Sequence, residues 1–275
     1  MTARPPLTWL YVPGDRPDRV AKALDSTADV VIVDLEDAVL ADVKDAARAS
    51  AAAALGTIPA SRPTQVRVNA SGTPWHVGDV AMVAALPQHV GVRLPKAESV
   101  EAVRQVSADA PNRPVHLLVE SALGLERAYD LATATSDVAS LGLGEADLRA
   151  DLGVEGDDGM LWARGRIVAA AVAAGLPPPA MAAHTDVRDL DGLAASCRTG
   201  RALGFLGRTA IHPAQLEVIR AAFTPTDAEV ARAREILAAA DQAMTEERGA
   251  VALADGRFVD AAVLRQARRV LALAG

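Results

Sequence analysis

The chain has 275 residues, and its 35 acidic and 28 basic side chains give a formal net charge of −7. This acidity argues against nucleic acid as the main partner, since phosphate binding requires a basic surface. Hydrophobic residues make up 51% and charged residues 23% of the chain, which is typical of a folded globular protein. No uncharged apolar stretch approaches the roughly 20 residues of a membrane span, and no signal peptide is expected. The single cysteine, Cys197, cannot form an internal disulfide, which favours a cytoplasmic protein.

Short β-branched runs alternate with longer alanine-rich stretches along the first 223 residues. The predicted strands cover residues 8–13, 30–36, 64–69, 89–96, 115–121, 138–144, 178–184 and 204–213. The first predicted helix ends at residue 24, and the others cover 41–55, 74–86, 100–108, 124–134, 159–174, 190–203 and 214–222. Eight strand–helix units at a spacing of roughly 25–30 residues are typical of a (β/α)8 TIM barrel. A doubly wound open sheet is the main alternative, but the first strand lacks the glycine-rich loop of a dinucleotide-binding fold.

The pattern changes after Phe223. Residues 224–244 predict a helix, and residues 250–260 predict a hairpin that turns at Asp255-Gly256, followed by a last helix. We therefore expect an α/β barrel catalytic domain of residues 1–223 and a C-terminal helix–hairpin–helix extension of residues 224–275. A barrel needs no such extension, which could pack on its own barrel or reach across to a neighbour; we expect it to pack on a neighbouring subunit.

Two acidic residues follow adjacent predicted strands. In a barrel the active site lies at the carboxyl ends of the strands, where Glu120 and Asp147 are placed. Neighbouring strands are about 4.8 Å apart, and two carboxylates at that separation repel each other unless something neutralises them. Mg²⁺ is commonly held by one or two protein carboxylates and fits this pair. The alternative is that each acid caps the following helix or pairs with an arginine.

Two basic residues also stand at strand ends. Arg67 lies inside the apolar strand VRVN, where it must be paired or face a polar cavity. It can bind a substrate carboxylate, or form a salt bridge to Asp34 or Glu36 on the adjacent strand, and both can hold together. Lys96 is the only lysine at a strand end and could form a Schiff base, or it could be a solvated side chain.

Eight motifs run in order along nearly the whole chain and together resemble one family. They are LYVPGDRPDRVAKAL, VVIVDLEDAV, VRVNASGT, LPKAES, VESALGL, GEADLRADLG, GFLGRTAIHPAQ and GRFVDAAVL. Each is weak alone, but their order and spacing resemble the citrate lyase beta-subunit-like family of CoA-ester lyases. This family belongs to the superfamily of phosphoenolpyruvate/pyruvate-type barrels.

The resemblance implies a (β/α)8 barrel that uses Mg²⁺ to cleave a citryl-, malyl- or citramalyl-type thioester. The products would be an acyl thioester and a 2-keto acid, namely oxaloacetate, glyoxylate or pyruvate. By position, Glu120 and Asp147 match the family's metal ligands, and Arg67 matches the residue that binds the keto-acid carboxylate. Asp260 matches an acid that a neighbouring subunit inserts over the site. The role of Glu145, two residues before Asp147, is left open because relatives often carry an acid directly before the ligand.

The same resemblance suggests roles for the remaining candidates. Asp260 would exchange a proton with the enolate carbon in a retro-Claisen cleavage, while Glu36 and Asp37 would position Arg67 or a water molecule. Arg16 and Lys96 are expected to contact the coenzyme A arm of the substrate. We expect a homo-oligomer, with a trimer as the expected state, and an acyl-carrier subunit remains open as a partner. The alternatives are a thioesterase or synthase on the same esters, a keto-acid aldolase, and last a non-catalytic barrel.

Overall fold

The computed structural model describes residues 4–245, 251–252 and 258–274. The chain divides into two compact units, one of residues 6–220 and the other of residues 221–275 together with the first five residues. The first unit contains the parallel sheet and carries every candidate site residue except Asp260. None of the described helices is long and apolar enough to cross a membrane.

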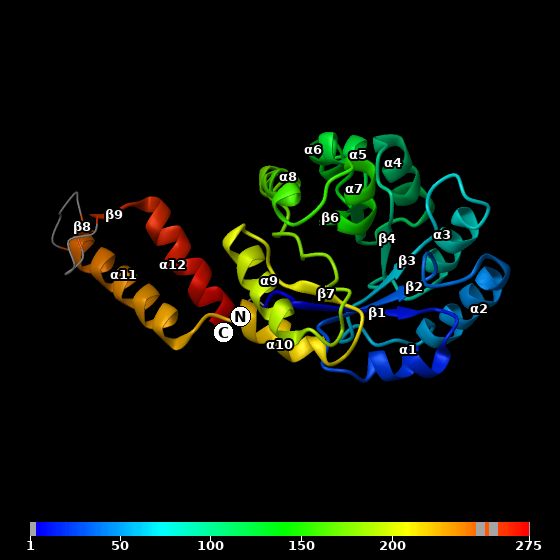
Figure 1. Cartoon of the computed structure of the whole chain (residues 1–275), viewed down its shortest axis with the longest axis horizontal. Helices are drawn as coiled ribbons and strands as arrows, with labels where there is room; N and C mark the ends of the chain where they lie inside the picture. Colours follow the sequence, from blue (N-terminus) through cyan, green and yellow to red (C-terminus); the bar gives the residue numbers. More distant parts are fainter. Residues whose placement is uncertain (1–3, 246–250, 253–257, 275) are drawn as a thin grey trace. The chain divides into compact units, whose positions relative to one another are not determined.

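A parallel sheet of seven strands forms the centre of the first unit, in the order β6-β5-β4-β3-β2-β1-β7. The strands are β1 (Thr8–Pro13), β2 (Val30–Asp34), β3 (Thr64–Arg67), β4 (Gly91–Leu94), β5 (Val115–Val119), β6 (Val138–Leu143) and β7 (Arg208–Ala210). All five residues of β2 are buried, as expected for a strand covered on both faces. Figure 1 shows the strands surrounded by helices.

The closed eight-stranded barrel is not confirmed. The segment predicted as the seventh strand, residues 178–184, forms one isolated parallel bridge, between Met181 and Arg208. Pro177, Pro178 and Pro179 lack N–H donors, which limits how far this segment can extend a ladder. Within the described residues no strand ladder joins it to β6, so the observed sheet has seven strands and is open between these two segments.

The helices of the first unit follow the strands in alternation. They are α1 (Pro17–Leu24), α2 (Lys44–Leu55), α3 (His76–Ala85), α4 (Val100–Asp109), α5 (Ala122–Glu126), α6 (Ala128–Ala132), α7 (Glu145–Leu152), α8 (Leu161–Ala173) and α9 (Leu190–Ala202), with α10 (Gln215–Phe223) at the unit boundary and short 3-10 turns at Ala41–Val43 and Asp158–Met160. The single helix predicted over residues 124–134 is divided at Arg127. Helix α7 was not predicted, because it is short and has no apolar face, yet it places Asp147 directly after β6.

Several polar side chains on the strands bind one another across neighbouring strands of the sheet. Arg93 on β4 donates from Nε to the Tyr11 hydroxyl at 2.8 Å and from Nη1 to Gln65 Oε1 at 3.3 Å. His116 on β5 pairs in register with Arg93, and its Nδ1 lies 2.8 Å from Ser140 Oγ. Polar groups taken from water need such partners, and here neighbouring strands supply them.

The second unit contains the rest of the tail. Helix α11 (Asp227–Thr245) begins with a capping box, in which Thr226 Oγ1 accepts from Glu229 N and the Glu229 carboxylate accepts from Thr226 N. Strands β8 (Val251–Ala252) and β9 (Phe258–Val259) pair antiparallel, as the predicted hairpin requires, while its turn at Asp255-Gly256 lies outside the described residues. Helix α12 (Ala261–Ala274) follows. Packing of this unit on a neighbouring subunit stays a prediction.

We expect His116 to reduce stability in acid. Burial and the nearby Arg93 charge lower the pKa of His116 to about 3, against an ordinary value near 6.5. A depressed pKa contributes stability that is present above pH 6.5 and lost as the pH falls toward 3, by at most about 1.4 kcal/mol per pH unit. The free energy of unfolding, measured with urea between pH 7.5 and 4, should therefore fall less with decreasing pH in His116→Asn than in the wild type. The same substitution at the exposed His212 is the control. If stability falls with pH in His116→Asn as steeply as in the wild type, the proposed effect of the His116 pKa is wrong.

Candidate active site

A cavity of about 890 Å³ lies inside the curl of the sheet. Every one of the seven strands contributes to its lining, through Tyr11, Asp34, Arg67, Arg93, Leu118, Leu143 and Arg208. Glu120 and Asp147, which follow β5 and β6, line it as well. A polar cavity at the carboxyl ends of parallel strands is where α/β enzymes of this architecture bind their substrates.

Arg67 lies at the centre of a group of carboxylates. Its Nε and Nη2 donate to the two oxygens of Asp34 at 2.7 and 2.6 Å, and its Nη1 donates to Asp37 Oδ2 at 3.1 Å. The same Nη1 lies 2.9 Å from Glu36 Oε2, an ion pair without hydrogen-bond geometry. The predicted salt bridge is therefore present, and three acids share one guanidinium.

Burial and charge oppose each other in this group. Burial alone would lower the pKa of Arg67, but the hydrogen bonds to Asp34 and the surrounding negative charge raise it. Burial raises the pKa of Glu36, although Arg67 and Lys96 beside it act in the other direction. Arg67 therefore remains charged, while burial disfavours the charged form of Glu36.

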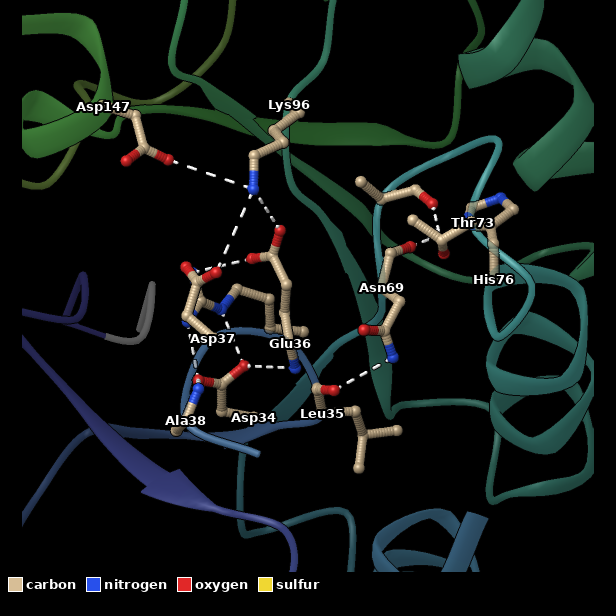
Figure 2. A network of polar contacts seen from close by, with 12 residues as sticks. Asp34, Leu35, Glu36, Asp37, Ala38, Asn69, Thr73, His76, Lys96 and Asp147 are labelled. Atoms are coloured by element: carbon tan, nitrogen blue, oxygen red, sulfur yellow. Dashed lines mark hydrogen bonds and ion pairs between the residues drawn. The ribbon is translucent and has the colours of Figure 1, made fainter. Parts of the chain in front are cut away.

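Backbone contacts hold the acidic loop after β2 in place. The buried ammonium of Lys44, at the start of α2, donates to the carbonyls of Leu35 and Glu36, each at 2.8 Å. Asn69 Nδ2 donates to Leu35 O at 2.9 Å (Figure 2). The same nitrogen donates to Asp79 Oδ2 at 2.6 Å. The loops that follow β2 and β3 are thus tied to each other.

Lys96 connects this loop to the other side of the cavity. Its backbone has the left-handed φ of 48°, an uncommon value for a residue with a side chain. Nζ donates to Glu36 Oε1 at 2.8 Å and lies 4.0 Å from both Asp37 Oδ1 and Asp147 Oδ2. Figure 2 shows the ammonium between Asp147 on one side and the acids of the β2 loop on the other. Burial opposes the charge of Lys96, but Glu36 raises its pKa, which leaves no neutral amine for a Schiff base.

Glu120 carries a buried carboxyl that is not fully paired. The residue is 5% exposed, and its Oε1 has no hydrogen-bond partner in the described part of the chain. Burial, the adjacent Asp147 carboxyl and the Glu36 charge raise the pKa of Glu120 to about 8. The glycine at 144 makes room for it, because a Cβ there would lie 2.9 Å from Glu120 Cδ and closer still to Cγ.

The alternatives expected for these two acids do not hold. Helix α5 is capped by Ser121, whose Oγ accepts from Gly124 N at 3.1 Å, so Glu120 is free of that role. Helix α7 has no side-chain cap, and within the described residues neither Glu120 nor Asp147 pairs with an arginine. Two carboxylates brought together with an unsatisfied oxygen fit a hard divalent cation such as Mg²⁺. No set of three or more such ligands gathers among the described residues.

The remaining predicted residues lie elsewhere. Arg16 is exposed and contacts only Asp18 among the described residues, at 3.3 Å. Asp260 belongs to the second unit, where its Oδ1 accepts from Ala262 N and Val263 N at 2.8 and 2.9 Å and caps α12. Glu145, whose role was open, pairs through both oxygens with Arg164.

Sequence reasoning missed two residues that line the cavity. Tyr11 has the Arg67 guanidinium 5.1 Å from its ring centre and that of Arg93 5.7 Å from it. Arg93 stands inside the apolar strand VRL just as Arg67 stands inside VRVN, so the argument applied to Arg67 would have found it.

Comparison with known proteins places this site in a family. The profile of the HpcH/HpaI aldolase/citrate lyase family matches residues 7–213. The chain belongs to this family. Among curated relatives, the citrate lyase subunit beta-like protein of Mycobacterium tuberculosis is 39% identical over 97% of this chain and 95% of its own length. A (3S)-malyl-CoA thioesterase of Cereibacter sphaeroides is 36% identical, covering 99% and 95%, and an L-malyl-CoA/beta-methylmalyl-CoA lyase of the same species is 33% identical, covering 98% and 94%.

Solved structures agree with this family. The crystal structure of protein CitE from M. tuberculosis in complex with magnesium, acetoacetate and coenzyme A is 38% identical and covers 100% of both chains with a TM-score of 0.85. A citrate lyase beta subunit from the same organism, complexed with oxaloacetate and magnesium, is 38% identical, covers 81% of this chain and 98% of its own, and has a TM-score of 0.72. The α/β fold with a curled parallel sheet is therefore that of this family.

We expect Gly144→Ala to displace the Glu120 carboxyl. The backbone at this glycine has φ −88°, which alanine adopts without strain, so the effect should come from the clash of the new methyl group with Glu120. Calorimetry should show that Mg²⁺ affinity falls at least about tenfold, or roughly 1.4 kcal/mol. Gly165→Ala is the matched control, because a Cβ there meets nothing within 4 Å. Equal Mg²⁺ affinity in both variants would contradict the role of Gly144.

Proposed function

We propose that this protein is a Mg²⁺-dependent carbon–carbon lyase. Its substrate would be a citryl-, malyl- or citramalyl-type thioester of coenzyme A, cleaved to an acyl thioester and a 2-keto acid. The observation that carries the proposal is the buried, unsatisfied carboxyl of Glu120 beside Asp147, in a cavity that Arg67 also lines. Relatives whose structures were solved with magnesium, keto acids and coenzyme A support it.

Glu120 and Asp147 would hold the cation through carboxylate oxygens, and bound Mg²⁺ supplies Lewis-acid stabilisation of negative charge on substrate oxygens. Occupancy by the cation would also relieve the unfavourable approach of the two acids, which together with burial, the larger cause, raises the pKa of Glu120 to about 8. The Lys96 ammonium, 4.0 Å from Asp147, would orient that acid from the side of the acidic loop.

Arg67 would bind the carboxylate of the keto-acid part and stabilise charge on the neighbouring oxygen as the bond breaks. In the retro-Claisen step, the hydroxyl proton passes to a water molecule, the carbinol oxygen becomes the carbonyl oxygen of the keto acid, and the bond to the carbon next to the thioester carbonyl breaks. Its electron pair then forms the thioester enolate. Asp34, Glu36 and Asp37 would hold the guanidinium in one orientation, because each of them contacts it.

We propose that Asp260 completes this site from a neighbouring subunit and exchanges a proton with the enolate carbon. The protein would then be a homo-oligomer, and we expect a trimer. We also propose that the 178–184 segment closes each sheet into an eight-stranded (β/α)8 barrel. Each barrel of residues 1–223 would receive the 224–275 extension of a neighbour. A cyclic assembly would give every barrel one donated acid.

The coenzyme A arm is longer than the cavity and would lie across the loops at its mouth. Arg16 is the freer of the two predicted contacts, since it is exposed and its weak pairing with Asp18 can be exchanged for a phosphate. Lys96 is the more constrained contact, because one of its three N–H donors is already bonded to Glu36. An acyl-carrier subunit could present the substrate in place of coenzyme A, and we propose a cytoplasmic location.

A thioesterase is the second candidate, because the relative at 36% identity has that name. Both reactions would use the same two carboxylates, and the products distinguish them. A lyase releases a 2-keto acid and an acyl thioester, whereas a thioesterase releases free coenzyme A and a hydroxy acid. Assays on citryl-, malyl- and citramalyl-CoA with and without EDTA test the proposed function, and activity that resists EDTA would refute it.

We expect Glu120→Gln and Asp147→Asn each to remove most Mg²⁺ binding and nearly all turnover. Each change keeps the shape of the side chain but deletes one of the two anionic ligands. Titration calorimetry with Mg²⁺ and the lyase assay measure the two effects. Glu98→Gln, at an acid that does not line the cavity, is the control. Unchanged Mg²⁺ affinity in both site variants would refute the metal assignment.

We expect Asp260→Asn to assemble and bind Mg²⁺ normally but to turn over poorly. Asparagine caps a helix about as well as aspartate, so α12 keeps its cap while the carboxylate is lost. Mixing this variant with Asp147→Asn should restore activity, because some sites then combine an intact barrel with an intact tail. If mixed oligomers form and remain inactive, Asp260 does not act between subunits.

A further inference from the structure

Two arginines reach the cavity from adjacent strands, but their surroundings differ. All three nitrogens of Arg67 contact carboxylates, those of Asp34, Glu36 and Asp37. Arg93, one strand away on β4, has no carboxylate partner among the described residues. One guanidinium is therefore surrounded by negative charge, and the other is not.

Arg93 is a buried cation with an unused donor. The residue is 6% exposed, and its two hydrogen bonds go to neutral groups, the Tyr11 hydroxyl and Gln65 Oε1. Its Nη2 makes no hydrogen bond within the part of the chain that the structure describes, and it lies 3.1 Å from where a Cβ on Gly142 would be. Because Arg93 lines the cavity, this nitrogen is available to a bound molecule.

Neighbouring groups do not neutralise the charge of Arg93. His116, its register partner on β5, has a pKa lowered to about 3 by burial and by Arg93 itself, so its ring is neutral. Tyr11 and Gln65 are neutral as well. A buried charge without a counter-charge is costly, and a bound anion would offset that cost.

Arg113 shows what a purely structural buried arginine looks like in this protein. It is also 6% exposed and also lacks an acidic partner among the described residues. Its Nη1 and Nη2 donate to backbone carbonyls at residues 84, 86, 87 and 90, and it does not line the cavity. Arg93 differs on both points, which separates a binding role from a structural one.

We propose that Arg93 binds a second carboxylate of the substrate, the one at the far end of the keto-acid part. This inference rests on the proposed function and narrows it to substrates that release a dicarboxylic keto acid such as oxaloacetate. Arg67 and the cation would take the carboxylate next to the keto group, and Arg93 the distal one. A monocarboxylic product such as pyruvate or glyoxylate would leave Arg93 without its anion, and a site built to bind a charge discriminates against a substrate that lacks it.

Citryl-CoA and citramalyl-CoA test this directly, because they differ only in a carboxymethyl group against a methyl group. With Mg²⁺ present, the wild-type kcat/KM should favour citryl-CoA by at least about tenfold, the value of one charge-assisted pair. Arg93→Met, which keeps an unbranched apolar stem but removes the guanidinium, should lower kcat/KM for citryl-CoA at least about tenfold and change that for citramalyl-CoA less than about threefold. Arg113→Met is the matched control and should reduce thermal stability while keeping the wild-type ratio.

The outcomes separate the two proposals. If the wild-type kcat/KM for citramalyl-CoA equals that for citryl-CoA, the inference about Arg93 is wrong and the lyase proposal stands. The same holds if Arg93→Met lowers kcat/KM for both esters equally. If malyl-CoA is cleaved but neither of these two esters is, the inference about Arg93 is wrong and the lyase proposal stands. If none of the three esters is cleaved to a keto acid with Mg²⁺, both proposals are wrong. The wild-type ratio tests the inference even where Arg93→Met folds poorly.

Discussion

The ion pairs between Arg67 and three carboxylates hold the open end of the cavity together. Asp34 ends β2 and Glu36 and Asp37 lie on the loop after it, and the three would repel each other without the guanidinium from the adjacent strand. Lys96 extends the same network from Glu36 toward Asp147, so the acidic loop and the proposed metal ligands belong to one connected set of charges. The geometry of the proposed site therefore depends on Arg67 as much as on the residues that would hold the cation.

Charge balance distinguishes the buried basic residues of this protein. Lys44 and Arg113 donate hydrogen bonds to backbone carbonyls and hold loops in place. Arg67 donates hydrogen bonds to carboxylates, and these bonds fix the orientation of its guanidinium. Arg93 alone among these four, within the described residues, lines the cavity without a carboxylate partner, and this difference supports a role in substrate selection.

Asp260 has a structural role that is independent of the catalytic role proposed for it. It caps α12, which gives it a structural reason to be present, whether or not it acts in catalysis. The cap uses Oδ1, and the proposed proton exchange would use the other oxygen. Such a cap would orient the carboxylate at a helix end, where its charge is stabilised.

The sequence by itself determined the alternation of strands and helices, the family, and the acids and Arg67 at the strand ends. These follow from local pattern, because residue order along parallel strands decides which side chains reach the same end of a sheet. Tertiary structure decided the rest: the open sheet at the 178–184 segment, the short helix α7, and the partners of each charge. Which donors of Arg67 and Arg93 are used depends on the register and curvature of strands far apart in the chain, and no local pattern encodes those distances.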